Sequence, residues 1–146
     1  MSSYDEVAYT RKIAAYVEQR FEWKLKKYPA TYSELDYMAI SAGGRIVGAV
    51  EIKTRDLRVT DYDTAVVDLI KWESAVRFER LYAETEAWIV YAWARTNTLA
   101  RIRPSLTSGL ALGGLEPPGK PWRPVVYVPV TAWEFLENPP GTRAAS

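Results

Sequence analysis

The chain has 146 residues, 48% of them hydrophobic and 25% charged, with a net charge of +1 at pH 7. A chain of ~150 residues can bury roughly 70% of its unfolded surface, so folding requires neither disulfides nor a structural metal. Because the sequence contains no cysteine and no histidine, zinc fingers, cysteine or serine–histidine nucleophiles, and nucleases with a histidine base are excluded.

The first third of the chain predicts a long helix followed by a β-hairpin. Apolar residues recur at helical spacing over 5–27, and the helix is expected to end there because a proline follows. Two β-rich runs, 33–41 and 45–55, flank a Gly-Gly turn, which is a hairpin signal. In the second run Glu51 and Lys53 are two residues apart, so an extended strand places them on one face.

The remainder of the chain predicts a second long helix and several short strands. Apolar spacing indicates the helix over 62–83, and the acidic residues Asp61, Asp63 and Asp68 at its start are typical of helix capping. The other expected elements are strands at 87–93, 98–103 and 125–130, a surface loop at 105–124, a short helix at 131–136 and a disordered tail at 138–146. Residues 1–137 are thus predicted to form one α/β domain, a mixed central sheet flanked by two long helices.

The predicted hairpin brings two carboxylates and an ammonium together. Asp36 would lie on its first strand, near Glu51 and Lys53 on the second. Adjacent carboxylates repel each other unless a cation joins them or one of them binds a proton. A metal here would have oxygen ligands, which favours Mg²⁺, Ca²⁺ or Mn²⁺, and the carbonyl of Ile52 could supply a third oxygen. Lys53 could hold an attacking water and stabilise charge on a phosphate.

These residues, Asp36 and Glu51-Ile52-Lys53, resemble the active-site motif of the PD-(D/E)XK nuclease superfamily, and the resemblance covers roughly residues 5–105. The order of helix, hairpin, helix and strand is also similar. The run VEIKTR followed by Lys71-Trp72 is similar to small phage-encoded members. Leu35 stands where the family has a proline before the aspartate. The resemblance implies a restriction-endonuclease-like fold and a resolvase-like, restriction-like or exonuclease-like enzyme that cuts DNA with Mg²⁺, for which Mn²⁺ could substitute.

The same resemblance implies further site residues. Members often carry a metal-binding glutamate on the first helix. Glu18 and Glu22 are the candidates, and Glu18 is preferred because it adjoins the apolar side, although a solvated helix face is the alternative. Lys71 matches a lysine expected at the scissile phosphate, or it could lie along its apolar neighbours. Arg55 and Arg58 follow the motif strand and are expected to bind DNA at the mouth of the site.

Three other functions are compatible with the sequence. The chain could be a catalytically inactive DNA-binding or interaction subunit of the same fold, which a metal titration would distinguish. A ribonuclease-H-like hydrolase also uses clustered carboxylates, but it opens with strands rather than a helix. A structural protein could bind a partner through an aromatic surface, since the chain has six tryptophans and ten tyrosines.

Location and partners follow from what the sequence lacks and what it contains. The N-terminal residues show no signal-peptide pattern, and no stretch approaches the ~20 apolar residues of a membrane span. We therefore expect a cytoplasmic protein, or a phage-encoded one that acts in the host cytoplasm, with DNA as its partner. Some aromatic residues could stack on unpaired bases, and a homodimer would let so small a domain span a duplex. The residues do not define the shape of the DNA substrate.

Overall fold

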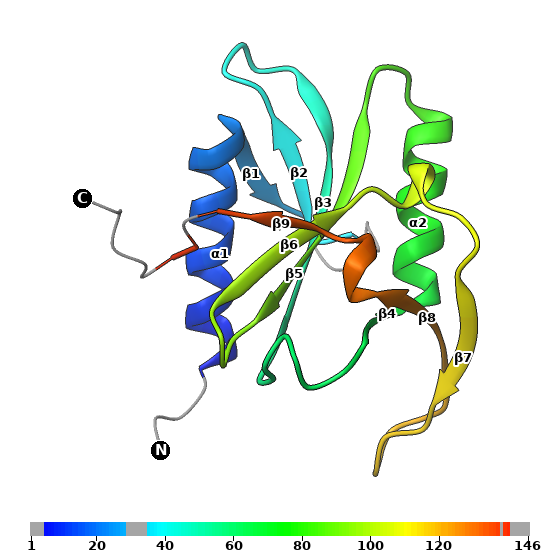
Figure 1. The fold of residues 1–146 in the computed structure, drawn as a ribbon. Helices are drawn as coiled ribbons and strands as arrows, with labels where there is room; N and C mark the ends of the chain where they lie inside the picture. The colour runs from blue at the N-terminus through cyan, green and yellow to red at the C-terminus, as the bar shows by residue number, and fades with distance from the viewer. Residues whose placement is uncertain (1–4, 29–34, 138, 141–146) are drawn as a thin grey trace.

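A six-stranded mixed sheet forms the centre of the structure (Figure 1). The computed structural model describes residues 5–28, 35–137 and 139–140. In sheet order the strands are β1 (Lys24–Lys27), β2 (Tyr37–Ile40), β3 (Ile46–Arg55), β5 (Glu86–Trp93), β6 (Thr98–Ile102) and β9 (Glu134–Leu136). A second sheet contains, again in sheet order, β4 (Thr64–Asp68), β8 (Arg123–Pro129) and β7 (Ala111–Leu115).

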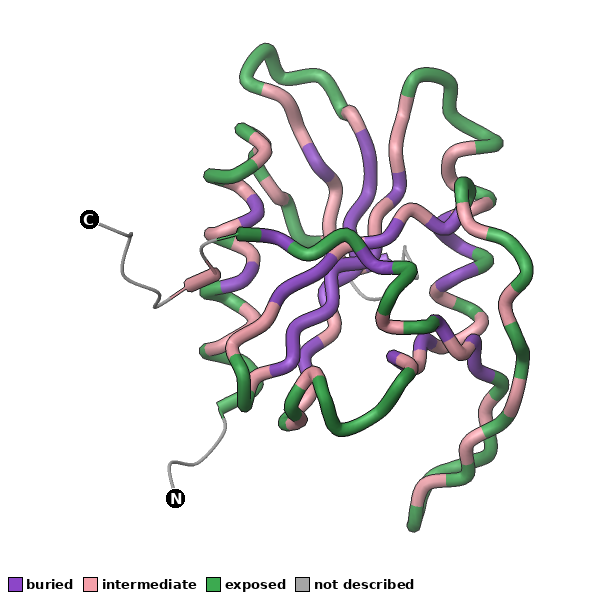
Figure 2. The backbone as a smooth tube through the Cα atoms, viewed as in Figure 1, coloured by how far each residue is buried: buried purple, intermediate pink, exposed green. Residues whose placement is uncertain are grey.

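One helix covers each face of the six-stranded sheet. Helix α1 (Glu6–Phe21) packs Val17 into a cluster with Ile52 of β3, whereas α2 (Leu69–Leu81) packs against Ala49. Successive strand residues point to opposite faces, so β3 is buried on both sides (Figure 2). The expected mixed sheet is confirmed, but the helices have 16 and 13 residues and are shorter than predicted.

The predicted hairpin is confirmed, and β3 also pairs with a strand from later in the chain. β2 runs antiparallel to β3, with Tyr37 opposite Val50. β5 runs parallel to β3, and the connection between them passes through β4 and α2. The two parallel strands approach closely at Gly48, where a Cβ would lie 2.0 Å from the carbonyl oxygen of Glu86. This packing therefore requires glycine at position 48.

The first predicted helix, 5–27, is too long. It ends at Glu22, which adopts the left-handed conformation with φ of 58°. Residues Lys24–Lys27 form β1 instead, with Leu25 paired opposite Ala39 of β2. Helical spacing continues through this segment, but pairing with an open sheet edge and partial burial of Leu25 outweigh the weak local preference.

The second predicted helix, 62–83, begins late, at Leu69. The residues before it form β4, in which Ala65 and Val67 are buried and their neighbours are partly exposed. The capping prediction was wrong for Asp68, whose side chain makes no capping hydrogen bond although it occupies the N-cap position. Asp61 instead closes a turn, because its Oδ2 accepts a hydrogen bond from the Arg58 N–H at 2.8 Å.

The C-terminal third contains more strand than predicted. The expected loop at 105–124 includes β7, which forms a hairpin with β8. The expected helix at 131–136 is a 3₁₀ turn at Val130–Ala132 followed by β9, because Glu134 pairs with Arg101 across to β6 instead of capping a helix. The predicted tail lies outside the described residues, apart from 139–140. Neither helix in the described ranges has the length and apolar character needed to cross a membrane.

Candidate active site

Asp36 and Glu51 lie next to each other on the α2 side of the central sheet. The register that pairs Tyr37 with Val50 places Asp36, the residue before β2, opposite Glu51 of β3. The Asp36 N–H donates a hydrogen bond to Oε1 of Glu51 at 3.2 Å. Since residues opposite each other in an antiparallel pair share a face, the hairpin holds the two carboxyl groups side by side.

The Glu51 carboxyl group is buried among charged neighbours. Only 7% of Glu51 is exposed, and Nζ of Lys71, on α2, lies 3.5 Å from its Oε1. Burial and the adjacent charge of Asp36 raise the pKa of Glu51 to about 7, while the cations Lys71 and Lys53 limit the rise. A carboxyl group in this state can exchange its proton for a metal ion near neutral pH.

Lys53 and Lys71 share a small cavity with Glu51. Its volume is about 10 Å³, close to the space that one water needs. The lining residues are Glu51, Lys53, Val67, Asp68, Lys71 and Ile89. Burial lowers the pKa of Lys53, and the charge of nearby Arg55 lowers it further, whereas Asp68 and Glu51 act in the opposite direction. An ammonium at this position can hold a water or a phosphate oxygen by hydrogen bonds.

Asp68 is a site residue that the sequence interpretation missed. It lies at the end of β4 and lines the same cavity as Lys53. Its Oδ1 lies 2.8 Å from Nε of Arg123, on the neighbouring strand β8, so an ion pair within the second sheet holds Asp68 at the edge of the cavity. The four residues before it, Thr64 to Val67, show no regular alternation of apolar and polar side chains, so the strand that ends at Asp68 depends on its pairing with β8.

Glu18 is not gathered with the other two carboxylates. Its Oε2 accepts a hydrogen bond from the Leu25 N–H at 2.8 Å, which joins the end of α1 to β1. Within the described ranges, no three acidic side chains are placed to hold one metal ion. Burial raises the pKa of Tyr37, with smaller contributions from the charges of Asp36, Glu51 and Glu18. Glu22 is exposed at the end of α1.

The remaining predicted residues are distributed around this centre. The Ile52 side chain is buried on the α1 face, away from Glu51. Arg55 lies close enough to lower the pKa of Lys53, and its Nη1 donates a hydrogen bond to the Thr54 carbonyl at 3.1 Å. Arg58 lies in the exposed turn that Asp61 closes. The fold thus brings Arg55 to the site, while Arg58 stays in its turn.

This donor set fits a hard divalent cation. Mg²⁺ is usually held by one or two carboxylates together with waters and substrate oxygens. Asp36 and Glu51 would supply the carboxylates, and the raised pKa of Glu51 reflects a negative charge that a cation would stabilise. Lys53 and Lys71 add two fixed positive charges, so the site can attract an anionic group such as a phosphate.

The fold is similar to that of Hjc, a Holliday junction resolvase from the archaeal hyperthermophile Archaeoglobus fulgidus. The TM-score is 0.50, the two chains are 14% identical, and the match covers 81% of this chain and 86% of the resolvase chain. At this level of identity the likeness shows a shared fold. Comparison with protein families and with curated proteins finds no match. The expected resemblance to resolvase-like nucleases is therefore supported at the level of the fold.

Proposed function

We propose that this protein is a nuclease that hydrolyses DNA phosphodiester bonds with Mg²⁺. The observation that carries the proposal is the position of Asp36 opposite Glu51, with Lys53 and Lys71 beside them. Clustered carboxylates and ammonium groups in a resolvase-like fold form a centre suited to phosphoryl transfer. The similarity to a Holliday junction resolvase supports DNA as the substrate.

Each residue has a distinct role in this proposal. Asp36 and Glu51 would hold the metal, with the Ile52 carbonyl as a further ligand, and Mg²⁺ or Mn²⁺ would supply charge stabilisation at the phosphate. Lys53 would hold the attacking water and stabilise charge that grows on the phosphate oxygens. Lys71, which pairs with Glu51 at 3.5 Å, would contact the scissile phosphate.

Two arginines and one glutamate have secondary roles in this proposal. Arg55 and Arg58 would bind phosphates on either side of the cut. Glu18 would serve as a third carboxylate only after its hydrogen bond with the Leu25 N–H is released.

Replacement of Lys53 tests the mechanism. Lys53→Ala should reduce cleavage by about 100-fold or more, because removal of one preorganised charge stabiliser has an effect of this size in other enzymes. The assay follows labelled linear, nicked, flapped, single-stranded and four-way DNAs with Mg²⁺ or with EDTA. Lys12→Ala is the matched control, since Lys12 is an exposed lysine on α1.

Circular dichroism and thermal unfolding must show that the Lys53→Ala protein is folded. If a folded Lys53→Ala protein cuts as fast as the wild type, the proposed role of Lys53 is wrong. If the wild type cuts equally fast in EDTA and in Mg²⁺, the reaction does not depend on a metal.

One observation favours a second function, that of a non-catalytic DNA-binding subunit. The ion pair between Lys71 and Glu51 already balances the buried carboxylate without a metal. A calorimetric Mg²⁺ titration of wild-type protein and of Glu51→Gln separates the two functions. Binding that is lost in the variant supports the nuclease, whereas absence of Mg²⁺ binding in the wild type supports the subunit.

A further inference from the structure

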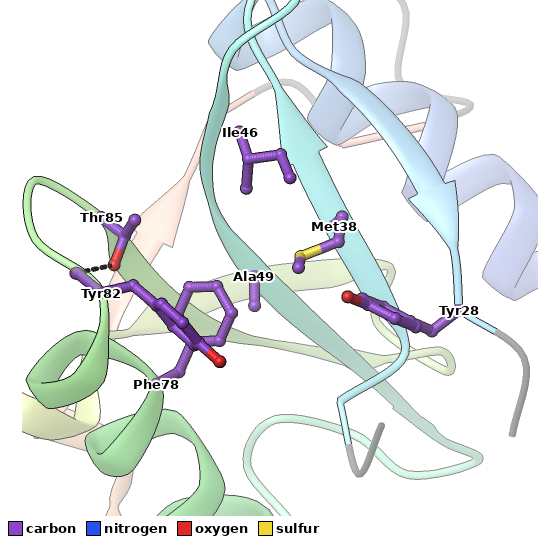
Figure 3. A pocket seen from close by; sticks show the side chains of 7 residues that line it. All are labelled: Tyr28, Met38, Ile46, Ala49, Phe78, Tyr82 and Thr85. Atoms are coloured by element: carbon purple, nitrogen blue, oxygen red, sulfur yellow. Dashed lines mark hydrogen bonds between the residues drawn. The ribbon is translucent and has the colours of Figure 1, made fainter. Parts of the chain in front are cut away.

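An aromatic pocket lies beside the paired carboxylates, on the same face of the sheet. Its volume is about 470 Å³, within the range of small-molecule sites in proteins. Figure 3 shows Ala49 and Met38 between the ring of Tyr28 on one side and those of Phe78 and Tyr82 on the other. The Phe78 and Tyr82 ring centroids are 5.0 Å apart, so the helix side of the pocket is a wall of two rings.

The register of the sheet connects this pocket to the active site. The Tyr28 N–H donates a hydrogen bond to the carbonyl of Asp36 at 2.9 Å, which makes Tyr28, Asp36 and Glu51 neighbours in one row across three strands. Ala49, at the base of the pocket, is two residues before Glu51, a separation of about 7 Å along a strand. A nucleotide whose phosphate lies at Glu51 can therefore place its base in the pocket.

One side of helix α2 contacts both the carboxylate pair and the aromatic pocket. Lys71 and Phe78 are seven positions apart, two turns of a helix, so they share a side that faces the sheet. Lys71 contacts Glu51, and Phe78 lines the pocket. The helix therefore presents the cation of Lys71 near its start and the aromatic rings of Phe78 and Tyr82 at its end.

Positive charge continues outward from the pocket. Lys26 pairs with Met38, and Lys24 pairs with Ile40, so both lysines project to the face that carries the pocket. Both are exposed on the edge strand β1. Rings that can stack on bases, bordered by lysines that can bind phosphates, are the features with which proteins bind single-stranded nucleic acid.

We infer that this pocket stacks an unpaired base of the DNA strand that is cut, so that the substrate is single-stranded at the cleavage point. The inference rests on the proposed function, because it takes the phosphate next to that base to lie at Asp36 and Glu51. A base inside a duplex is already stacked and paired and cannot enter such a pocket without being extruded. Flaps, single-stranded ends and unpaired junction segments satisfy this requirement.

A binding assay without catalysis tests the inference. The probes are a fluorescein-labelled thymidine oligonucleotide of about 12 nucleotides, within the range that a small domain covers, and an abasic oligonucleotide with the same backbone. Fluorescence anisotropy is measured in EDTA and again in Ca²⁺. Wild-type protein should bind the base-bearing strand roughly tenfold more tightly than the abasic strand.

Tyr82 can be replaced with little effect on folding because its side chain is largely exposed. It is 54% exposed, and Tyr62, which is 65% exposed and does not line the pocket, is the matched control. Tyr82→Ala should lose most of the preference for the base-bearing strand, Tyr82→Phe should keep it because the ring remains, and Tyr62→Ala should keep it. Equal binding of both strands by wild-type protein, no binding of either, or an unchanged preference in Tyr82→Ala overturns the inference.

The two proposals can fail separately. If Mg²⁺-dependent cleavage is absent but the base preference depends on Tyr82, the nuclease mechanism is wrong and the pocket is still a base-binding site. If cleavage occurs while both strands bind equally, the mechanism stands and the pocket holds no base. Cleavage of a fully paired duplex at the same rate as a flap also overturns the inference.

Discussion

At the scale of single residues, Glu51 carries a conflict between burial and charge. The residue is 7% exposed and its carboxyl group lies beside another acid, and both conditions favour the protonated form. A residue that served only the fold would be better replaced by an uncharged one. The conflict is understandable if a cation resolves it, which is what the proposed function requires.

The pKa of Glu51 predicts a pH-dependent stability in metal-free protein. The folded state raises this pKa from 4.5 to about 7, so the folded state binds the proton more tightly than the unfolded chain. The stabilisation is therefore complete below the lower value and is lost as the pH rises through the upper one. By about pH 8 the free energy of unfolding should have fallen by about 3 kcal/mol, and the Glu51→Gln protein should not show this decrease.

Urea unfolding in EDTA at about pH 5 and about pH 8 measures this difference. Glu73→Gln is the control, since Glu73 is exposed on α2. The decisive quantity is the change in unfolding free energy between the two pH values. The prediction is wrong if that change is the same in wild-type protein and in Glu51→Gln.

At the scale of elements, the close approach of β3 and β5 at Gly48 predicts a matched pair of variants. Gly48→Ala places a Cβ 2.0 Å from the backbone oxygen of Glu86, whereas a Cβ at Gly43 would have its nearest neighbour at 3.9 Å. Overpacking of this kind costs about 1–3 kcal/mol, while a surface change usually stays within about 0.5 kcal/mol. Chemical denaturation should show a clear loss in Gly48→Ala and little change in Gly43→Ala, and equal stabilities would contradict the packing.

The elements that could be predicted from the sequence are those whose pattern is local. The hairpin of β2 and β3 has alternating residues and a Gly-Gly turn, and both strands were predicted. β1 and β4 were read as parts of helices, because each is short and adjoins a true helix. Their strand conformation depends on partners elsewhere in the chain, β2 for one and β8 for the other, and a local pattern does not contain that information.

The same reasoning separates the predicted part of the site from the missed part. Asp36, Glu51 and Lys53 lie on one hairpin, so their spacing was enough to bring them together. Asp68 was missed because its partner Arg123 lies on a strand that is distant in the sequence. The aromatic pocket was missed for a similar reason. Tyr28 follows β1 and Tyr82 follows α2, so the two rings are far apart in the sequence and meet only in the folded chain.

At the scale of the whole molecule, metal binding and folding should be linked. A ligand that binds only the folded state stabilises it by about 2.7 kcal/mol at a concentration of 100 times its Kd. Saturating Mg²⁺ should therefore raise the Tm by roughly 5–10 °C. Asp36→Asn should remove this increase, because it removes one of the two proposed carboxylate ligands.

Differential scanning calorimetry with Mg²⁺ and with EDTA checks this prediction. Asp63→Asn is the control, because Asp63 is an exposed acid in the turn before β4. A Tm of the wild type that does not respond to Mg²⁺ would count against a metal at this site. So would an equal response in Asp36→Asn.

The parallel pairing of β3 with β5 also has a kinetic consequence. The acidic pair belongs to a hairpin of neighbouring strands, and contacts between nearby parts of a chain form early. Lys71 lies on the crossover between β3 and β5. Its ammonium group can therefore balance the charge of the acidic pair only after that long connection has packed against the sheet. The barrier to refolding thus includes two acids that face each other before Lys71 is in place, and the chain should refold faster at about pH 5 than at about pH 8. Stopped-flow dilution from urea would reveal this acceleration, and Glu51→Gln should refold at similar rates at both pH values.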